Sequence, residues 1–539
     1  MTYQPTTDLY EGIASAFPLE LFPWDAYFAR MAETDVLCGN ENVRSVHSYF
    51  IRKAPFGGSY ALLGGITRAL RTMRELNFND PDFELGMRER NHAPQFIRYL
   101  KEKGGLKDIE VYAPPEGTPF FPNEPIISIA GPSPQVRLAD GILIGKCNFA
   151  SLSLTKWHRF ARVVRPGAAF DFSLRRAQNQ MESSLYAILG GCAGTSNCEL
   201  SRHFKVSVVG TMGHEWMESF PTVHEAFDVW LTHQPHLPVG LVDTVRCMEV
   251  DFPAWLDALY KHREQVKAAN PAIWASRDDS GDLAYLSIEQ YVRFLAHPLA
   301  EDPWFVERMR TMLTNELDEY RAADIIAQVS TQARAAGLDS EDILRRVMWA
   351  AGTRTGTCID DPSIGAVAKQ TEWNGLACIK LALDADGRVG VKTSLPGFNR
   401  SGMIRNAGEF PGVLIYPDHR YAVRPSGVLY DKVRHHDLKT LEAVHPDNES
   451  LSHAFGSYAI EPRQELVLAN GELTEAWERT RPTIESVQRL VREATDALPW
   501  WMTQIQKSHL APVSVTRDIF DLRARMIRRN ALQCEYAAF

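Results

Sequence analysis

The sequence predicts an α/β protein whose central part is a parallel β-sheet closed into a barrel. From about residue 166 onward, short apolar runs alternate with helical stretches. Strand–helix alternation at this density is typical of a parallel sheet. Polar residues fall at or just beyond the ends of these runs. In a barrel such ends gather on one face, which is where functional sites are built.

Length and composition indicate a globular protein of two or three structural units. The chain has 539 residues, of which 45% are hydrophobic and 23% charged, as is ordinary for globular proteins. The net charge of −9 argues against broad nucleic-acid binding, although it allows a local basic pocket for phosphates. We find neither an apolar run long enough to span a bilayer nor a signal peptide. The sequence therefore predicts a cytoplasmic protein without nucleic-acid or membrane partners.

Eight cysteines are scattered along the chain, and no pair has C-x-x-C spacing. This spacing indicates neither a zinc site nor a disulfide framework, and reduced thiols fit a cytosolic protein.

The first 165 residues are expected to form a mixed α/β unit with no catalytic cluster of its own. We expect a strand over 43–52, a helix over 88–103 and a proline-led turn with a strand within 118–131. Thr7 or Asp8 could cap a short helix near the N-terminus.

The central stretch contains six apolar runs that we expect to be strands, most of them followed by a helical stretch. The runs are 168–174, 206–211, 239–244, 273–279, 310–315 and 347–353. The second run is short enough to be a buried strand. It leads through a glycine turn to His214, which is expected at the start of a helix.

The residues at the run ends suit a phosphorylated sugar that meets a flat ring. Arg175, Arg176 and Arg277 are cations suited to phosphates or carboxylates. The backbone of 352–357, GTRTGT, can offer N–H groups to a phosphate. No G-x-x-x-x-G-K-[ST] sequence is present, which argues against a P-loop.

Four further side chains complete this chemistry. Asp279 and Asp282 could accept hydrogen bonds from ribose hydroxyls or bind a metal through water. Phe172 could stack on a flat ring. His214 could act as a nucleophile or a general base.

Nine motifs occur in order over residues 5–380. They are TDLYE, FIRKAPFGGSYALLGGI, FPNEPIISIAGP, DFSLRRAQ, GTSN, GTMGHEW, LVDT, DSGDLAYLS and GTRTGT. In their order and spacing the sequence resembles the nicotinate phosphoribosyltransferases. The resemblance implies an incomplete (β/α) barrel of the type II phosphoribosyltransferase kind and an α/β sandwich formed by both chain ends. The expected divisions are 1–165 and 391–539 for the sandwich and 166–390 for the barrel.

The resemblance also implies an activity. Members of the family join nicotinic acid to 5-phosphoribosyl-1-pyrophosphate, giving nicotinate mononucleotide and pyrophosphate in NAD salvage. They hydrolyse ATP through a phosphohistidine, use Mg²⁺ and form homodimers. The resemblance assigns no metal ligand to a residue of this chain.

Residue roles carry over from the matching motifs. His214 matches the histidine that ATP phosphorylates, Asp243 an acid near it, and Asp279 the acid on the ribose. Phe172 is expected to stack on the pyridine ring, and Tyr10 to cover it from the neighbouring subunit. The remaining substrate-binding residues implied are Arg175, Arg277, Thr195, Ser196, Gly352 and Thr353.

Ser196 favours the acid over the amide as substrate. Related nicotinamide enzymes have aspartate at the equivalent position, and a carboxylate there would repel nicotinate, whereas serine can donate to it. A nicotinamide phosphoribosyltransferase and a non-catalytic mononucleotide-binding relative are the alternatives.

Two motifs depart from the family pattern. Arg246 stands where the family often has a second aspartate, and Ala350 stands where it has the first glycine of the phosphate turn.

Near the C-terminus, helices are expected over 483–497 and 517–531. The arginines of the second helix are interpreted as a solvated basic face. They are Arg523, Arg525, Arg528 and Arg529.

Overall fold

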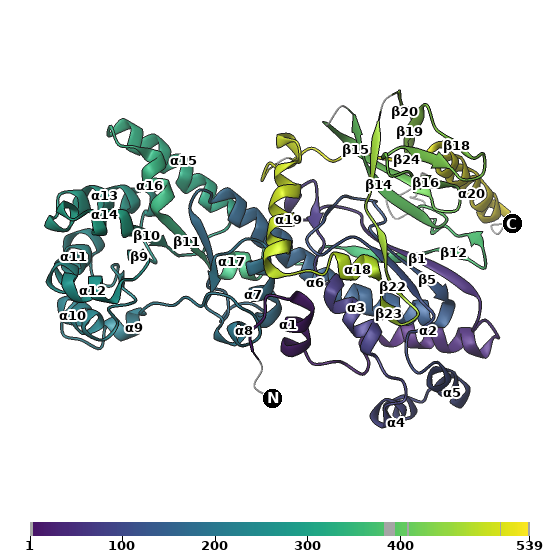
Figure 1. The fold of residues 1–539 in the computed structure, drawn as a ribbon, viewed down its shortest axis with the longest axis horizontal. Coiled ribbons are helices and arrows are strands. Elements are labelled where there is room, and N and C mark those ends of the chain that lie inside the picture. The colour runs from purple at the N-terminus through teal and green to yellow at the C-terminus, as the bar shows by residue number, and fades with distance from the viewer. Residues whose placement is uncertain (1–3, 382–393, 407–408, 457, 507, 537–539) are drawn as a thin grey trace. The chain divides into compact units, whose positions relative to one another are not determined.

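The computed structural model describes residues 4–381, 394–406, 409–456, 458–506 and 508–536 (Figure 1). The chain divides into two compact units, one of residues 1–5 and 153–362 and the other of residues 6–152 and 363–539. We call them the half-barrel unit and the sandwich unit. Among the described residues, no helix is long and apolar enough to cross a membrane.

The half-barrel unit is organised around a six-stranded parallel sheet in the order β7-β6-β11-β10-β9-β8. Its strands are β6 (Ala168–Asp171), β7 (Gly194–Thr195), β8 (Val239–Leu241), β9 (Trp274–Asp278), β10 (Met309–Leu313) and β11 (Val347–Ala351). β7 and β8 are the two edges and do not pair with each other. The closed barrel expected from the alternation is therefore wrong, and the incomplete barrel implied by the resemblance is confirmed.

Helices follow the strands as predicted and lie alongside the sheet (Figure 1). The long ones are α7 (Gln180–Leu189), α10 (Val223–His233), α11 (Phe252–Lys261), α13 (Leu283–Leu295) and α15 (Glu319–Ala335). Asp282 caps α13 by accepting a hydrogen bond from the Tyr285 N–H at 3.1 Å. This N–H group is in the first turn, where the helix itself provides no acceptor. The cap gives Asp282 a structural role, and the ribose or metal role considered for it stays a prediction. The short elements are α8 (Cys198–His203), α9 (His214–Met217), α12 (Arg263–Ala269), α14 (Pro303–Arg308), α16 (Ser340–Arg346) and α17 (Thr353–Gly356).

The segment 206–211 is not the buried strand that its valines predicted. It makes one parallel bridge, from Val208 to Thr195 at the edge of the sheet, and Val208 is 43% exposed. Few partners are available at this edge because the sheet does not continue beyond it. His214 nevertheless begins a short helix, α9, as expected.

Strand alternation separates the two faces of the half-barrel sheet. On the concave face, Phe170, Met312 and Met348 form a small apolar layer. On the helix-covered face, Trp255 of α11 and Trp274 of β9 belong to a larger core. The site residues at the strand ends are thus supported by apolar packing beneath them.

The sandwich unit joins both ends of the chain, as the resemblance implied. Its seven-stranded sheet has the order β13-β12-β1-β5-β3-β22-β23. In it β1 (Arg44–Ile51) pairs antiparallel with β12 (Ala366–Trp373) on one side and with β5 (Ile127–Pro132) on the other. The other members are β3 (Glu110–Ala113), β13 (Leu376–Ala377), β22 (Glu465–Ala469) and β23 (Glu472–Leu473).

A second, six-stranded sheet in the order β20-β19-β24-β15-β14-β21 belongs to the same unit. Its strands are β14 (Asn399–Asn406), β15 (Glu409–Pro417), β19 (Leu441–His445), β20 (Asn448–Phe455), β21 (Ala459–Pro462) and β24 (Val513–Thr516). Helix α20 (Arg517–Tyr536) follows β24 directly. Its Arg525, Arg528 and Arg529 are exposed as predicted, but Arg523 is buried, so that part of the prediction is wrong.

The helices of the sandwich unit match the predictions in part. Asp8 caps α1 (Leu9–Ala16), and Thr483 forms a capping box with Ser486 at the start of α19 (Ile484–Asp496). The predicted helix over 88–103 is two helices, α4 (Pro81–Glu89) and α5 (Pro94–Lys103). The others are α2 (Ala26–Leu37), α3 (Ile66–Glu75) and α18 (Glu475–Arg479). The 31 residues of α6 (Ser133–Val163), a helix that was not predicted, are divided between the two units.

Candidate active site

Two adjoining pockets lie at the carboxyl ends of the half-barrel strands. The first, the His214 pocket, has an empty volume of about 870 Å³, and the second, the Gly352 pocket, one of about 730 Å³. They share the side chains of Phe172, Arg175, Arg277 and Asp279. Ser196 and His214 line the first, and Gly352 and Thr353 the second. Eight of the predicted site residues are thus brought together in one hollow.

Arg277 stands between the two pockets. Its Nη1 donates to Thr211 Oγ1 at 2.8 Å and to the Met212 carbonyl at 3.2 Å, while Nη2 lies 3.4 Å from Asp279 Oδ2. Its Nε is buried and has no hydrogen-bond partner among the described residues. A buried guanidinium N–H without an acceptor is unfavourable, so this nitrogen is suited to an anionic ligand.

The rest of the hollow is also basic. Arg175 and Arg176 line the Gly352 pocket and are exposed. Neither makes an ion pair with an acid in the described part of the chain. Arginines held free in a concave site are suited to phosphate and carboxylate groups.

His214 lies beside two carboxylates. Its Nδ1 is 3.3 Å from Thr244 Oγ1, and its Nε2 is 3.8 Å from Asp243 Oδ1 and 3.9 Å from Asp279 Oδ2. The side chain is 40% exposed. The imidazole is therefore oriented from one side and open to a ligand.

Asp243 holds the turn that carries Asp279. Its Oδ2 accepts from the Asp279 N–H at 3.0 Å and from Ser280 Oγ at 2.6 Å. Its Oδ1 is buried without a hydrogen-bond partner in the described residues. Thr314 donates to Asp279 Oδ1. These bonds fix the Asp279 carboxylate beside His214.

Phe172 and Ser196 offer a flat surface and a hydroxyl. The Arg277 guanidinium carbon lies 5.8 Å from the centre of the Phe172 ring. The Ser196 N–H donates to the Asp171 carbonyl at 2.7 Å, which places the residue at the end of β7 beside β6.

Thr195 lies behind the pockets rather than in their walls. Its hydroxyl donates to Asp171 Oδ2 at 2.7 Å, and both residues are fully buried. Asp171 also accepts from the Ser173 N–H and hydroxyl. Asp171 had no predicted role, although an acid that ends an apolar strand was a signal for one.

The turn after β10 carries two consecutive left-handed residues that are not glycine. Asn315 has φ of 83° and Glu316 has φ of 51°, and both line the Gly352 pocket. Arg354 Nε lies 2.7 Å from Asp318 Oδ2, and this ion pair joins the two turns that flank the pocket. Strained backbone of this kind persists where the surroundings hold it, most often at functional sites.

Asp278 points to the opposite side of the sheet from Arg277, because neighbouring strand residues face opposite ways. Its Oδ1 accepts from Gln290 Nε2 of α13 at 2.8 Å and from Cys247 Sγ at 3.4 Å, and its Oδ2 has no partner in the described residues. Burial, together with the charge of Asp243, raises the pKa of Asp278 to about 7. Sequence reasoning missed this buried acid because it is next to Asp279 in the motif.

We expect Asp278→Asn to stabilise the protein at alkaline pH. In the folded state the Asp278 carboxyl keeps its proton up to about pH 7, whereas in the unfolded chain it loses the proton near pH 3.8. The wild type therefore loses stability as the pH rises through this window. Asparagine carries no charge, so the variant should gain up to about 4 kcal/mol at pH 8 and little at pH 4. Urea unfolding at both pH values measures this.

The matched control is Asp339→Asn. Asp339 is an exposed cap of α16, and asparagine caps helices equally well. A gain for Asp278→Asn that is the same at pH 4 and pH 8 would contradict the buried-acid explanation.

Tyr10 belongs to the other unit. It is 5% exposed, and its hydroxyl donates to Glu75 Oε1 at 3.0 Å. The Arg481 guanidinium lies 5.6 Å from its ring centre. Its role at a neighbouring subunit stays a prediction of the resemblance.

Metal-binding clusters are absent from the described part of the chain: no three His, Cys, Asp or Glu side chains there are grouped to hold an ion. Seven cysteines, at positions 38, 147, 192, 198, 247, 358 and 378, take part in no disulfide bond.

Comparison with known proteins agrees with the fold. Residues 23–144 match the model of the nicotinate phosphoribosyltransferase (NAPRTase) N-terminal domain. The nicotinate phosphoribosyltransferase of Bacillus subtilis is 25% identical over 93% of this chain and 94% of its own. Nicotinate phosphoribosyltransferase 2 of Arabidopsis thaliana is 26% identical over 92% of both.

A solved structure shares the fold. The crystal structure of human nicotinic acid phosphoribosyltransferase superposes with a TM-score of 0.71 and 21% identity, covering 93% of this chain and 99% of that one. The half barrel and the two-ended sandwich define a type II phosphoribosyltransferase fold. In sequence and fold, the chain is similar to the nicotinate phosphoribosyltransferases.

Proposed function

We propose that this protein is a nicotinate phosphoribosyltransferase of NAD salvage. It would join nicotinate and 5-phosphoribosyl-1-pyrophosphate to give nicotinate mononucleotide and pyrophosphate. The observation that carries the proposal is the hollow that Arg175, Arg176 and Arg277 line together with the aromatic ring of Phe172 and the Asp279 carboxylate. The names of its relatives support the same activity.

The substrates would be placed by charge and shape. Phe172 would stack on the pyridine ring, and Ser196 and Arg277 would receive its carboxylate. The phosphates would be bound by the arginines and by the turn at Gly352 and Thr353. The hydroxyls of the ribose would donate to Asp279.

The reaction breaks the bond from ribose C1 to pyrophosphate and forms a bond from C1 to the ring nitrogen. Positive charge develops on the ribose as pyrophosphate leaves with its electron pair. The protein would contribute by positioning the two partners and by neutralising the leaving group with arginines. Asp279, held by Asp243 and Thr314, would stabilise the ribose.

Mg²⁺ fits this hollow only as an ion held largely by the substrate. Mg²⁺ commonly uses one or two carboxylates together with phosphate oxygens and water. Asp243 would be its protein ligand, since its Oδ1 is buried without a partner among the described residues. The ion would neutralise charge on the leaving pyrophosphate.

Coupling to ATP is a further part of the proposal. A ring nitrogen of His214 would attack the γ-phosphorus of ATP, and the bond to ADP would break. The open position of the imidazole and its contact with Thr244 support this role. The phosphoryl group would add about two negative charges beside the arginines, which would alter substrate affinity. A homodimer, with Tyr10 reaching the neighbouring site, is proposed on the resemblance alone.

The proposal is tested by pyrophosphate release from purified protein with phosphoribosyl pyrophosphate and Mg²⁺. Nicotinate and nicotinamide are each supplied with and without ATP. Release with nicotinate that ATP stimulates is the expected result. Release with nicotinamide alone would make the protein a nicotinamide enzyme, and binding of the mononucleotide without release would make it a sensor.

We expect Ser196→Asp to lower kcat/KM for nicotinate by about tenfold to a hundredfold, because a carboxylate would face the substrate carboxylate. The effect on nicotinamide should be smaller. The control is Ser196→Ala, which removes the hydroxyl without adding charge. Equal losses for the acid and the amide would contradict the assigned role of Ser196.

A further inference from the structure

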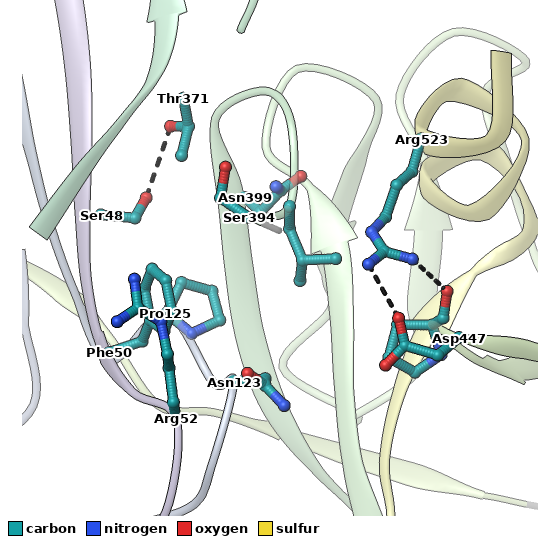
Figure 2. Close-up of a pocket in the computed structure, with 12 residues that line it drawn as sticks. Ser48, Phe50, Arg52, Asn123, Pro125, Thr371, Ser394, Asn399, Asp447 and Arg523 are labelled. Atoms are coloured by element: carbon teal, nitrogen blue, oxygen red, sulfur yellow. Dashed lines mark hydrogen bonds and ion pairs between the residues drawn. The ribbon is translucent and has the colours of Figure 1, made fainter. Parts of the chain in front are cut away.

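A second cavity lies within the sandwich unit, between its two large sheets (Figure 2). Its empty volume is about 680 Å³. Strands β1 and β12 form one wall, and the turn after β19 and helix α20 form another. We call it the inter-sheet cavity. None of its lining residues belongs to the half-barrel unit, so the proposed activity does not use it.

The walls of the inter-sheet cavity carry more positive than negative charge. Arg523 donates to the Pro446 carbonyl at 2.7 Å and pairs with Asp447 at 2.8 Å, as Figure 2 shows. On the opposite wall, Arg52 makes no ion pair with an acid in the described residues. The lining therefore holds two guanidinium groups and one carboxylate.

Both arginines have an unused donor. The Nε atoms of Arg52 and Arg523 are buried and lack hydrogen-bond partners among the described residues. Arg523 as a whole is 7% exposed. A buried cationic donor without an acceptor is costly, so an anion between these walls would be stabilised by both arginines.

A neighbouring lysine adds to the positive charge. Burial lowers the pKa of Lys369 on β12, and the charges of Arg52 and Lys380 lower it further, against the opposing effect of Asp140. Cations that destabilise one another in this way would be relieved by one negative charge.

The remaining lining is apolar or neutral. Phe50, 7% exposed, and Leu395 offer apolar surface. Asn123 and Asn399 offer amides. A ligand of this cavity therefore needs an apolar body as well as its charge.

We propose that the inter-sheet cavity binds a small organic monocarboxylate. Its carboxylate accepts hydrogen bonds from Arg52 and Arg523, since arginine and carboxylate match in geometry and charge. Its body packs on Phe50 and Leu395. One negative charge balances the two guanidinium groups and one carboxylate of the lining.

Benzoate, a flat monocarboxylate, is the probe for this proposal. The titration is followed by ligand-observed NMR with full-length Arg277→Gln protein, in which a carboxylate loses one of its proposed partners in the candidate active site. Saturable binding is expected. Adding Arg52→Gln should weaken it about tenfold or more, and adding Leu395→Trp, which fills the cavity without changing charge, should weaken it similarly.

The matched control is Arg88→Gln, which removes an exposed arginine of the same unit. It should leave benzoate affinity unchanged. Absence of saturable binding, or affinity that neither Arg52→Gln nor Leu395→Trp reduces, would overturn the proposal. If inorganic phosphate bound as tightly as benzoate, the ligand would not need an apolar body, and that part of the proposal would be wrong. None of these outcomes depends on catalysis, so the benzoate titration tests this proposal independently of the proposed function.

Discussion

Arg277→Gln is expected to lower kcat/KM for 5-phosphoribosyl-1-pyrophosphate, measured by pyrophosphate release, by about 10²–10³. The guanidinium stands in both pockets, and its buried Nε lacks an acceptor among the described residues. Preorganised donors aimed at developing negative charge contribute about 2.7–4 kcal/mol each to transition-state binding. Glutamine removes the charge and, being shorter than arginine, also withdraws the donors from the pockets. Steady-state kinetics with saturating nicotinate measures the loss.

Two further variants separate charge from structure. Arg277→Lys keeps the charge but not the planar fork, so it should recover only part of the activity. Arg202→Gln removes an exposed arginine of the same unit and should leave kcat/KM unchanged. If Arg277→Gln lost no more activity than Arg202→Gln, Arg277 would have no role in binding the anionic substrate.

His214→Ala is expected to abolish the stimulation by ATP while keeping slow, ATP-independent transfer. The alanine variant has no ring nitrogen to receive a phosphoryl group, but it keeps Asp243 and Asp279, which hold each other in place. The ratio of rates with and without ATP should therefore fall to about one. The same pyrophosphate-release assay measures it, and retention of ³²P from γ-labelled ATP reports the phosphohistidine.

His224→Ala is the matched control, since His224 is an exposed histidine on α10 of the same unit. It should keep both the stimulation and the label. Undiminished ATP stimulation in His214→Ala would mean that coupling does not pass through this histidine.

The sequence determined much of the site because its polar residues follow apolar strands. Parallel strands that point the same way place their carboxyl ends together. Phe172, His214, Asp279 and Gly352 therefore meet, although more than 100 residues separate the first from the last.

Other features depended on which strands meet. Valines predicted a buried strand at 206–211, but no strand is available to continue the sheet there, so Val208 stays exposed. The alternation of strands and helices predicts a parallel sheet. It carries no information on whether the two edge strands pair, which is why the predicted closure was wrong.

By itself, the sequence determined the parallel strands and their helices, the order of the polar strand ends and the likeness to a family. Only the tertiary structure decided which of two adjacent acids faces the pocket. Asp278 turns to α13 and Asp279 to His214, because strand direction and packing fix the orientation of each side chain. It likewise decided that Arg523 of α20 is buried while Arg525 is exposed. The physical reason is that burial depends on what packs against a residue, and a local pattern does not contain its partners.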